Sequence, residues 1–338
     1  MERNASKEFY FQWHFLNSCN LRCKHCYQEN YKFQDMGLDK LIAVADEIVS
    51  TLTKWGMYGR ISLTGGEPFT SKHLYDLLDY LNSLDRIVSI DILTNGTLIS
   101  DNDVKKLGVY DKLHQVQISL DGGNEKVHDS IRGKGSFQRA IEGIRKLKNV
   151  NIEVALMYTL QNLNKDGYND YIDIAIAENV DAITIERVTP CGQSVKENII
   201  PAEEIKRIYT DITKRANEIT KKPVIRRSRP LWINTSCDNT RKDCNIGGFC
   251  PVGFTALAIL HDGTVLPCRR MEIPLGNILT DGLFKIWYTS DVLWKIRDKN
   301  NLKGKCHGCE NLPFCGGCRA IAYATTGDYM EEDPQCWK

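Results

Sequence analysis

Short apolar runs typical of β-strands alternate with amphipathic helical patterns along the first 200 residues of the chain. The strand-type runs cover residues 9–16, 60–64, 88–93, 115–121, 151–158 and 182–188. The helical patterns between them cover residues 38–55, 72–84, 136–148 and 170–179. Apolar strands that alternate with helices at this spacing predict repeated βαβ units, in which helices cover a parallel sheet. Six such strands predict an α/β fold, a partial (β/α)6 barrel of the TIM type.

The pattern and composition of the sequence change in its last third. A helical pattern over residues 202–220 leads into the connector "KKPVIRRSRP", whose charges we expect to be solvated. After about residue 232 the strands shorten, and glycines and cysteines become frequent. We therefore predict a barrel domain over residues 1–198, a bridging helix and linker over 199–232, and a small cysteine-rich domain with a β-hairpin over 233–338.

Composition excludes several kinds of partner. The 338 residues include 44 basic and 43 acidic side chains, so the formal net charge of +1 gives no electrostatic reason to expect nucleic acid or acidic lipid. No apolar run approaches the ~20 residues that span a bilayer, and the first residues lack the pattern of a secretory signal. We expect a cytoplasmic enzyme that binds neither nucleic acid nor membrane.

Thirteen cysteines are distributed very unevenly. Three lie within residues 19–26, none lies within 27–190, and nine lie within 237–336, which leaves Cys191 alone between the groups. Thiols stay reduced in the cytosol, so clustered cysteines in such a chain indicate metal binding or catalysis rather than disulfides.

The first group, Cys19, Cys23 and Cys26, lies in the loop after the first strand. In a barrel of this kind, chemistry collects at the C-terminal ends of the strands. A [4Fe–4S] cluster has four irons, each normally bound by one cysteine thiolate, so three cysteines leave one iron open for a substrate or cofactor. A zinc site with a distant fourth ligand is the alternative.

The second strand ends in "LTGGEPF", which contains Gly65, Gly66 and Glu67. Two glycines let the backbone approach a ligand closely, and a carboxylate accepts hydrogen bonds from an ammonium. This motif and the cysteine triplet together resemble the radical S-adenosylmethionine (SAM) superfamily. The resemblance implies that the open iron binds SAM, and that residues 65–67 hold the methionine ammonium. It also implies reductive cleavage of SAM to a 5′-deoxyadenosyl radical, with flavodoxin or ferredoxin as electron donor.

The same resemblance implies further cofactor contacts. His25 matches an aromatic position within the cysteine motif, while Ser119 and Arg132 match positions that meet the SAM carboxylate. Thr94 and Asn95 lie where the ribose would be reached. For Arg132 the alternative is an ordinary surface arginine at the start of a helix.

Eight cysteines near the C-terminus are enough for two clusters with four thiolates each, and two zinc sites are the alternative. Between Cys250 and Cys268, alternating residues flank the turn signal Asp262–Gly263, which predicts a hairpin. The order of these cysteines resembles the SPASM extension of radical SAM enzymes, although "CGGC" has two residues between its cysteines where three are usual.

The SPASM resemblance implies two auxiliary [4Fe–4S] clusters, which makes three clusters with the one at the triplet. The first auxiliary cluster would be bound by Cys244, Cys250, Cys268 and Cys318. The second would be bound by Cys306, Cys309, Cys315 and Cys336.

Two cysteines then remain. Cys191 follows the sixth strand and is a candidate catalytic hydrogen-atom donor or substrate contact, or else a buried loop cysteine. Cys237 is an alternative ligand or a buried cysteine.

The family resemblance leaves the substrate open. The main hypothesis is maturation of a ribosomally made peptide by a thioether, a carbon–carbon crosslink or epimerisation. Because the first strand begins near residue 8, we expect a separate leader-recognition protein or recognition by the barrel itself. One alternative is a small-molecule enzyme for haem side-chain oxidation or decarboxylation, which "CGGCRAIAYATTGDYMEEDPQC" resembles. A further alternative is a sulfatase-type protein maturase.

Overall fold

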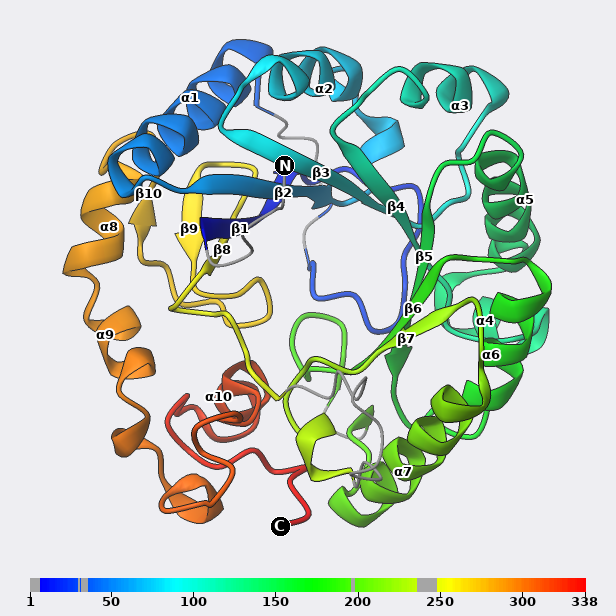
Figure 1. The fold of residues 1–338 in the computed structure, drawn as a ribbon, viewed down its shortest axis with the longest axis vertical. Helices are drawn as coiled ribbons and strands as arrows, with labels where there is room; N and C mark the ends of the chain where they lie inside the picture. Colours follow the sequence, from blue (N-terminus) through cyan, green and yellow to red (C-terminus); the bar gives the residue numbers. More distant parts are fainter. Residues whose placement is uncertain (1–6, 30, 32–35, 196–197, 236–247) are drawn as a thin grey trace.

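The structure is a computed structural model that describes residues 7–29, 31, 36–195, 198–235 and 248–338. Its centre is a curved sheet in which six parallel strands lie in chain order (Figure 1). They are β1 (Glu8–Leu16), β2 (Tyr58–Gly65), β3 (Ile87–Thr94), β4 (Leu113–Ser119), β5 (Val154–Leu160) and β6 (Ala182–Arg187). Each strand pairs in parallel with the next, which confirms the predicted α/β barrel.

Helices cover the outside of this sheet (Figure 1). They are α1 (Leu38–Trp55), α2 (Leu74–Ser83), α3 (Asp101–Leu107), α4 (Glu125–Arg132), α5 (Ser136–Lys148), α6 (Tyr168–Ala177) and α7 (Ala202–Glu218). The short helices α3 and α4 were not predicted, because their sequences carry few apolar residues. Their starts are fixed by side-chain caps instead: Ser100 and Asp103 form a capping box for α3, and Asn124 caps α4.

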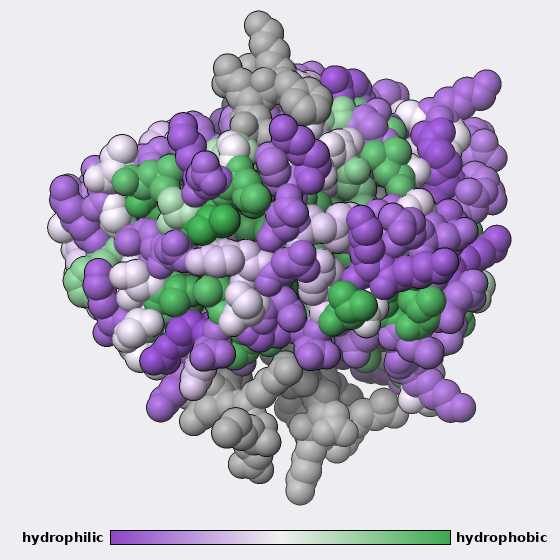
Figure 2. Space-filling model, turned by 90° about the horizontal axis from the view of Figure 1, so that it is seen from above, coloured by the Kyte–Doolittle hydropathy of each residue, from purple (hydrophilic) through white to green (hydrophobic). Residues whose placement is uncertain are grey.

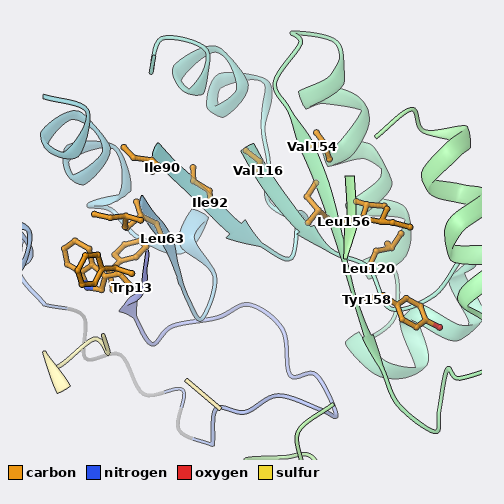
Figure 3. Packing of buried hydrophobic residues seen from close by; sticks show 14 of the residues in the cluster. Trp13, Leu63, Ile90, Ile92, Val116, Leu120, Val154, Leu156 and Tyr158 are labelled. Carbon is orange, nitrogen blue, oxygen red and sulfur yellow. The ribbon is translucent and has the colours of Figure 1, made fainter. Parts of the chain in front are cut away.

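The strands divide their side chains between two faces. Alternate residues such as Trp13, Leu63 and Ile92 are buried in one continuous hydrophobic core with the helices (Figure 3). The residues between them point the other way and form polar contacts across the sheet. The Tyr10 hydroxyl donates to Ser62 Oγ at 2.9 Å, and Ser62 in turn donates to the Asp91 carboxylate at 3.3 Å. The inner face of the barrel is therefore polar and hydrogen-bonded.

Two additions extend the sheet to ten strands. At one edge, β7 (Val224–Arg226) pairs in parallel with β6. At the other edge, the predicted hairpin is present as β8 (Ala256–Ile259) and β9 (Thr264–Leu266), followed by β10 (Gly276–Asn277). Strand β8 pairs in parallel with β1. The hairpin thus continues the barrel sheet, because β1 offers unpaired main-chain groups at its outer edge.

The expectation of a solvated connector at residues 221–230 is wrong for its strand. Val224–Arg226 pairs with the main-chain groups at the outer edge of β6, and the Arg226 side chain donates to the Gln115 side chain at 2.7 Å. Arg229 forms an ion pair with Glu186 at 2.9 Å. The two arginines therefore bind acceptors on strands of the sheet, the buried Gln115 on β4 and the partly buried Glu186 on β6.

The C-terminal region lies on the open side of the curved sheet (Figure 1). Its helices are α8 (Leu283–Thr289), α9 (Asp291–Arg297) and α10 (Arg319–Thr326). Short 3₁₀ turns occur at Pro68–Thr70, Trp232–Asn234, Lys299–Asn301 and Gly304–Cys306. On the face seen from the side of α1 and α2, small hydrophobic patches are separated by hydrophilic residues (Figure 2). Among the described residues, none of the helices has the length and apolarity needed to cross a bilayer.

Candidate active site

The cysteine triplet lies in the loop that leaves the C-terminal end of β1, where the barrel fold predicts an active site. Cys19, Cys23 and Cys26 are each partly exposed. Burial raises the pKa of Cys19 to about 11, and Glu67 and the other two thiols add to this rise. Thiols must lose their protons to bind metal, so a cationic centre is needed to stabilise this group of sulfurs as thiolates.

Gly65 and Gly66 let the triplet loop cross the end of β2. The Gly66 amide donates to the Leu16 carbonyl at 3.1 Å, and the Glu67 amide donates to the Ser18 carbonyl at 2.8 Å. A Cβ atom at Gly66 would lie only 1.9 Å from the Ser18 carbonyl oxygen. At Gly65 the φ angle is +140°, and a Cβ atom would lie 2.1 Å from the Leu16 carbonyl oxygen. The two glycines therefore position the loop, and their predicted contact with SAM stays a prediction.

Glu67 is fully buried and joins the ends of β2 and β3. Its carboxylate accepts hydrogen bonds from the Thr94 hydroxyl at 2.6 Å, the Asn95 amide at 2.7 Å and the Phe69 amide at 3.2 Å. Burial raises the pKa of Glu67, although these three hydrogen bonds oppose the rise. The carboxylate thus holds the turn after β3 against the motif that follows β2.

Thr94 and Asn95 are buried in that turn. The Thr94 hydroxyl also accepts a hydrogen bond from the Gly96 amide at 2.9 Å. The Asn95 side chain donates to Asn20 Oδ1, in the triplet loop, at 2.8 Å. Both predicted ribose contacts therefore connect β3 to the triplet loop, and a ribose contact by either stays a prediction. Ser119 is half-buried at the end of β4.

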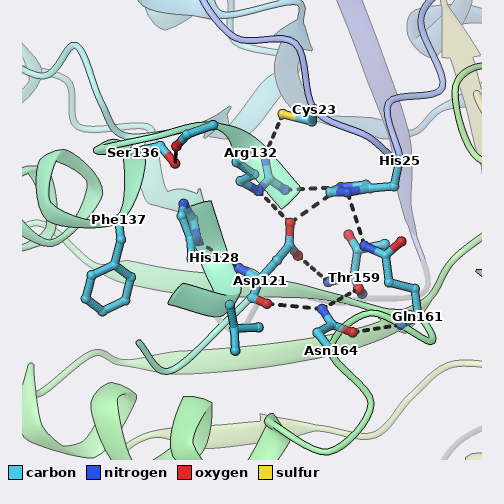
Figure 4. Close-up of polar contacts among 12 residues, drawn as sticks. Cys23, His25, Asp121, His128, Arg132, Ser136, Phe137, Thr159, Gln161 and Asn164 are labelled. Atoms are coloured by element: carbon cyan, nitrogen blue, oxygen red, sulfur yellow. Dashed lines mark hydrogen bonds and ion pairs between the residues drawn. The ribbon is translucent and has the colours of Figure 1, made fainter. Parts of the chain in front are cut away.

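A buried polar network lies beside the triplet (Figure 4). The Arg132 guanidinium donates through Nε to Asp121 Oδ2 at 2.5 Å, and its Nη1 lies 3.8 Å from Cys23 Sγ. His25 Nε2 lies 3.5 Å from both Asp121 Oδ2 and Arg132 Nη2. The other oxygen of Asp121 accepts from the Thr159 amide at 2.8 Å. Arg132 is the last residue of α4 and is 8% exposed, so the alternative of a surface arginine at a helix start is wrong.

The charges of this network follow from its burial. Burial acts to raise the pKa of Asp121, but the Arg132 guanidinium, helped by the hydrogen bond from the Thr159 amide, outweighs it, so the pKa lies below the ordinary value. Burial lowers the pKa of His25 to about 4, and Arg132 adds to this while Asp121 opposes it. At neutral pH the network is a carboxylate–guanidinium pair beside a neutral imidazole. It holds one guanidinium next to the triplet.

Sequence reasoning missed Asp121 and the residues that support it. His128 Nδ1 accepts from the Asp121 amide at 3.1 Å, and Asn164 donates to the Asp121 carbonyl at 3.1 Å. The Gln161 amide nitrogen lies 3.3 Å from His25 Nδ1. A carboxylate directly after a buried parallel strand was the available signal for Asp121.

The loop after β6 places Cys191 beside the triplet loop. The Gln193 amide donates to the Cys26 carbonyl at 2.7 Å, and a Cβ atom at Gly192 would lie 2.5 Å from that same oxygen. Burial raises the pKa of Cys191 to about 11, although Arg270 and Arg269 oppose the rise. Cys191 therefore lies between the triplet loop and the β8–β9 region, while its role stays a prediction.

Four C-terminal cysteines surround one cavity of about 340 Å³, part of which is open to solvent. They are Cys306, Cys309, Cys315 and Cys336, the set that the SPASM resemblance assigns to the second auxiliary cluster. Four thiolates are the usual ligands of a [4Fe–4S] cluster. The Arg319 guanidinium lies 3.8 Å from Cys306 Sγ, and its positive charge would stabilise the negative charge of four thiolates. This donor set fits the cluster.

The other C-terminal thiols lie near one another and near cationic side chains. Burial raises the pKa of Cys250 to about 12, and Cys318 and Cys268 add to the rise. The Arg270 guanidinium interacts electrostatically with the same three thiols. Cys244, the fourth predicted ligand of this cluster, and Cys237 lie outside the described residues.

No three histidine, cysteine, aspartate or glutamate side chains within the described ranges converge closely enough to hold a single metal ion. A [4Fe–4S] cluster takes one cysteine for each iron, so its ligands need not converge on one point.

A buried ion pair fastens the C-terminal region to the barrel. Arg187, at the end of β6, donates to both carboxylate oxygens of Asp333 at 2.9 and 2.7 Å, and also to Gln335 at 3.0 Å. Asp333 in turn accepts from the Cys318 amide at 2.8 Å. The position of the C-terminal cysteines is therefore tied directly to a strand of the barrel.

Comparison with known proteins gives two family matches. The radical SAM superfamily matches residues 13–175, and the SPASM iron–sulfur cluster-binding domain matches residues 250–310. Among curated proteins, the AdoMet-dependent heme synthase of Methanosarcina barkeri is 28% identical over 347 residues, covering 96% of this chain and 95% of its own length. Mycofactocin maturase MftC of Mycolicibacterium smegmatis is 27% identical over 346 residues, covering 99% of this chain and 84% of its own length.

Among solved structures, Streptococcus suis SuiB bound to its precursor peptide SuiA has the same fold. Its TM-score is 0.77 at 17% identity, over 98% of this chain and 76% of that one.

Proposed function

Because this chain belongs to the radical SAM superfamily and carries a SPASM iron–sulfur domain, we propose that it matures a ribosomally made peptide by removing a hydrogen atom from it. The family, the enzyme class and the kinds of cofactor expected from the sequence are confirmed by these matches. Proteins of this family bind SAM and a [4Fe–4S] cluster, and the SPASM domain binds auxiliary iron–sulfur clusters. The cytoplasmic location stays a prediction.

One observation carries the proposal: the triplet loop, Glu67 and the Asp121–Arg132 pair meet at one edge of the sheet. When bound there, the cofactors supply a 5′-deoxyadenosyl radical, formed together with methionine by one-electron reduction of SAM. The three cysteines would hold three irons and leave the fourth open. Asp121 keeps the Arg132 guanidinium beside the triplet, where it is available to a carboxylate.

The peptide substrate is supported by MftC, a maturase that matches nearly the whole chain. The proposed products, a thioether, a carbon–carbon crosslink or an epimerised centre, all begin with loss of one hydrogen atom to the radical. For the first two, loss of a proton and a second electron completes the change, and an auxiliary cluster would take that electron. For epimerisation, a hydrogen atom returns from a donor such as Cys191. We propose a separate leader-recognition protein and a flavodoxin or ferredoxin as further partners.

A second candidate is haem side-chain tailoring. It is favoured by the heme synthase of Methanosarcina barkeri, because the match covers 95% of the length of that protein. The two reactions change the mass of their substrates differently, so one mass-spectrometry experiment distinguishes the two candidate functions.

The test is anaerobic incubation of the reconstituted, reduced enzyme with SAM and precursor peptides encoded near its gene. We expect formation of 5′-deoxyadenosine and, for a crosslink, a peptide lighter by two hydrogens in mass spectrometry. The matched control replaces Cys19, Cys23 and Cys26 by alanine, which should remove about four of about twelve irons and all cleavage of SAM. Unchanged peptides, together with loss of carbon dioxide from a carboxylated porphyrin, would favour the second candidate.

A further inference from the structure

Arg319, the first residue of α10, is a buried cation with an unused donor. Its side chain is 6% exposed, and its Nη1 donates to the carbonyls of Tyr329 at 2.9 Å and Glu331 at 2.6 Å. Its Nη2 lies 3.8 Å from Cys306 Sγ, within the range of a weak N–H···S hydrogen bond. Its Nε is buried and has no hydrogen-bond partner among the residues that the structure describes. A buried N–H without an acceptor is costly unless a bound group supplies one.

The chain makes room for this guanidinium. Gly317, in the "CGGC" motif, has a φ of +64°, and a Cβ atom there would lie 2.8 Å from Arg319 Nη2. A side chain at this position would therefore strain the backbone and displace the guanidinium. The motif that leaves two residues between Cys315 and Cys318 thus also lets Arg319 pass over the chain toward Cys306.

The Arg319 guanidinium directly contacts the Cys306 thiol, while Asp328 interacts with its charge electrostatically without forming an ion pair. Among the ion pairs of the described residues, none joins Arg319 to an aspartate or glutamate, and its remaining hydrogen bonds go to neutral carbonyls. By contrast, Arg270 and Arg229, near Cys250, both pair with Glu186. Among the described residues, the Arg319 guanidinium therefore has no carboxylate in direct contact, whereas Arg270 and Arg229 share that of Glu186.

We propose that Arg319 is a positioning residue for the second auxiliary cluster, and that its Nε and Nη2 donate to cluster sulfurs and stabilise the reduced form. This inference rests on the cluster ligands assigned under the proposed function. Reduction adds one negative charge to the cluster, and a nearby cation and N–H···S hydrogen bonds favour that state. The second auxiliary cluster is then tuned to accept the electron that leaves the substrate.

The test compares Arg319→Gln and Arg319→Lys with wild type as anaerobically reconstituted holoenzymes. Iron content and potentiometric titration followed by electron paramagnetic resonance are measured on each. Glutamine keeps an N–H donor without charge, and lysine keeps the charge without the planar fork. The matched control is Arg297→Lys, because Arg297 also lies in the C-terminal region and, among the described residues, its hydrogen bonds go to the carbonyls of Gly253 and Trp287 and its cation–π contacts to tryptophan rings.

We expect one cluster midpoint to fall in Arg319→Gln by the equivalent of at least a tenfold change in the equilibrium, about 59 mV for one electron. The other midpoints should stay in place, and Arg297→Lys should match wild type. Full iron content with every midpoint unchanged in Arg319→Gln would overturn the inference and leave the clusters themselves in place.

Two further outcomes are decisive. If Arg319→Gln loses about four irons while its metal-free chain melts at the wild-type temperature, Arg319 holds the cluster directly, which supports the inference. If the metal-free chains of both variants melt at the same temperature, below that of the wild type, and both reconstituted variants bind equally less iron, Arg319 acts on the fold alone and the inference fails. A wild-type protein that binds far fewer than about twelve irons would instead refute the cluster assignment, before any variant is made.

Discussion

The buried pair of Asp121 and Arg132 allows a quantitative test of the candidate site. Asp121→Asn keeps the side-chain shape, so the Thr159 amide can still find an acceptor, but it removes the charge that faces the guanidinium. Asp121 is fully buried and Arg132 is 8% exposed, so water cannot replace the lost carboxylate. Removing one partner of a buried ion pair costs about 3–5 kcal/mol, and we expect the free energy of unfolding to fall by about this amount.

The assay is urea unfolding of the anaerobic holoenzyme, followed by circular dichroism. The double variant Asp121→Asn/Arg132→Met should be more stable than Asp121→Asn alone, because it removes the unpaired cation as well. The control is Glu203→Gln, which breaks the pair with Lys206; the two side chains are 77% and 52% exposed, so this change should cost about 0–1 kcal/mol. A cost below about 1 kcal/mol for Asp121→Asn, or additivity of the two changes within about 0.5 kcal/mol, would refute the reasoning.

The same variant should also slow the reaction. Without its carboxylate partner, the Arg132 guanidinium is no longer fixed 3.8 Å from Cys23 Sγ. Loss of such supporting contacts typically costs about 10–100-fold in activity, which 5′-deoxyadenosine formation measures directly. Wild-type rates in Asp121→Asn would show that the pair has no part in the site.

Three other changes give distinct outcomes. Burial lowers the pKa of His128 to about 4, so the unfolded chain binds its proton more tightly, and His128 should contribute about 2 kcal/mol to the stability lost between pH 7 and pH 5; His128→Gln should remove that share of the loss in a pH series of urea titrations, while His25 keeps its own. Gly66→Ala would place a methyl group 1.9 Å from the Ser18 carbonyl oxygen, so the triplet loop should shift and iron analysis should show about four irons lost. Asp333→Asn leaves Arg187 buried without its carboxylate and should cost about 3–5 kcal/mol in urea unfolding, with iron lost from the auxiliary clusters before the triplet.

The sequence allowed the six central strands to be predicted because each is a local apolar pattern of the expected length. Helices α1 and α5 have the predicted bounds for the same reason. Pairing between distant segments leaves no such local signal. The addition of β8 to β1, and of β7 to β6, depends on which sheet edges remain open once the barrel has formed.

In the candidate site too, local motifs could be predicted from the sequence, whereas contacts between distant residues could not. Spacing alone located the cysteine triplet and the motif at residues 65–67. Two of the three partners of Glu67, Thr94 and Asn95, lie 27 and 28 residues further along the chain, and only the meeting of two strand ends explains them. Asp121 was overlooked because its charge partner is eleven residues away, across a loop and a whole helix. Residues that hold other residues in place are recognised from three-dimensional contacts rather than from motifs.

The pairing of β8 with β1 has a consequence for the order in which the protein is made. Residues Tyr10–Trp13 of β1 pair with Ala256–Ile259 of β8, which are synthesised 246 residues later. At about 5–20 residues per second, the outer edge of the first strand waits roughly 12–50 seconds for its partner. During that interval the new barrel has an open edge, of the kind that recruits other strands. Once it is made, the C-terminal region covers this edge with β8 and closes it to other strands, in addition to carrying the auxiliary cysteines.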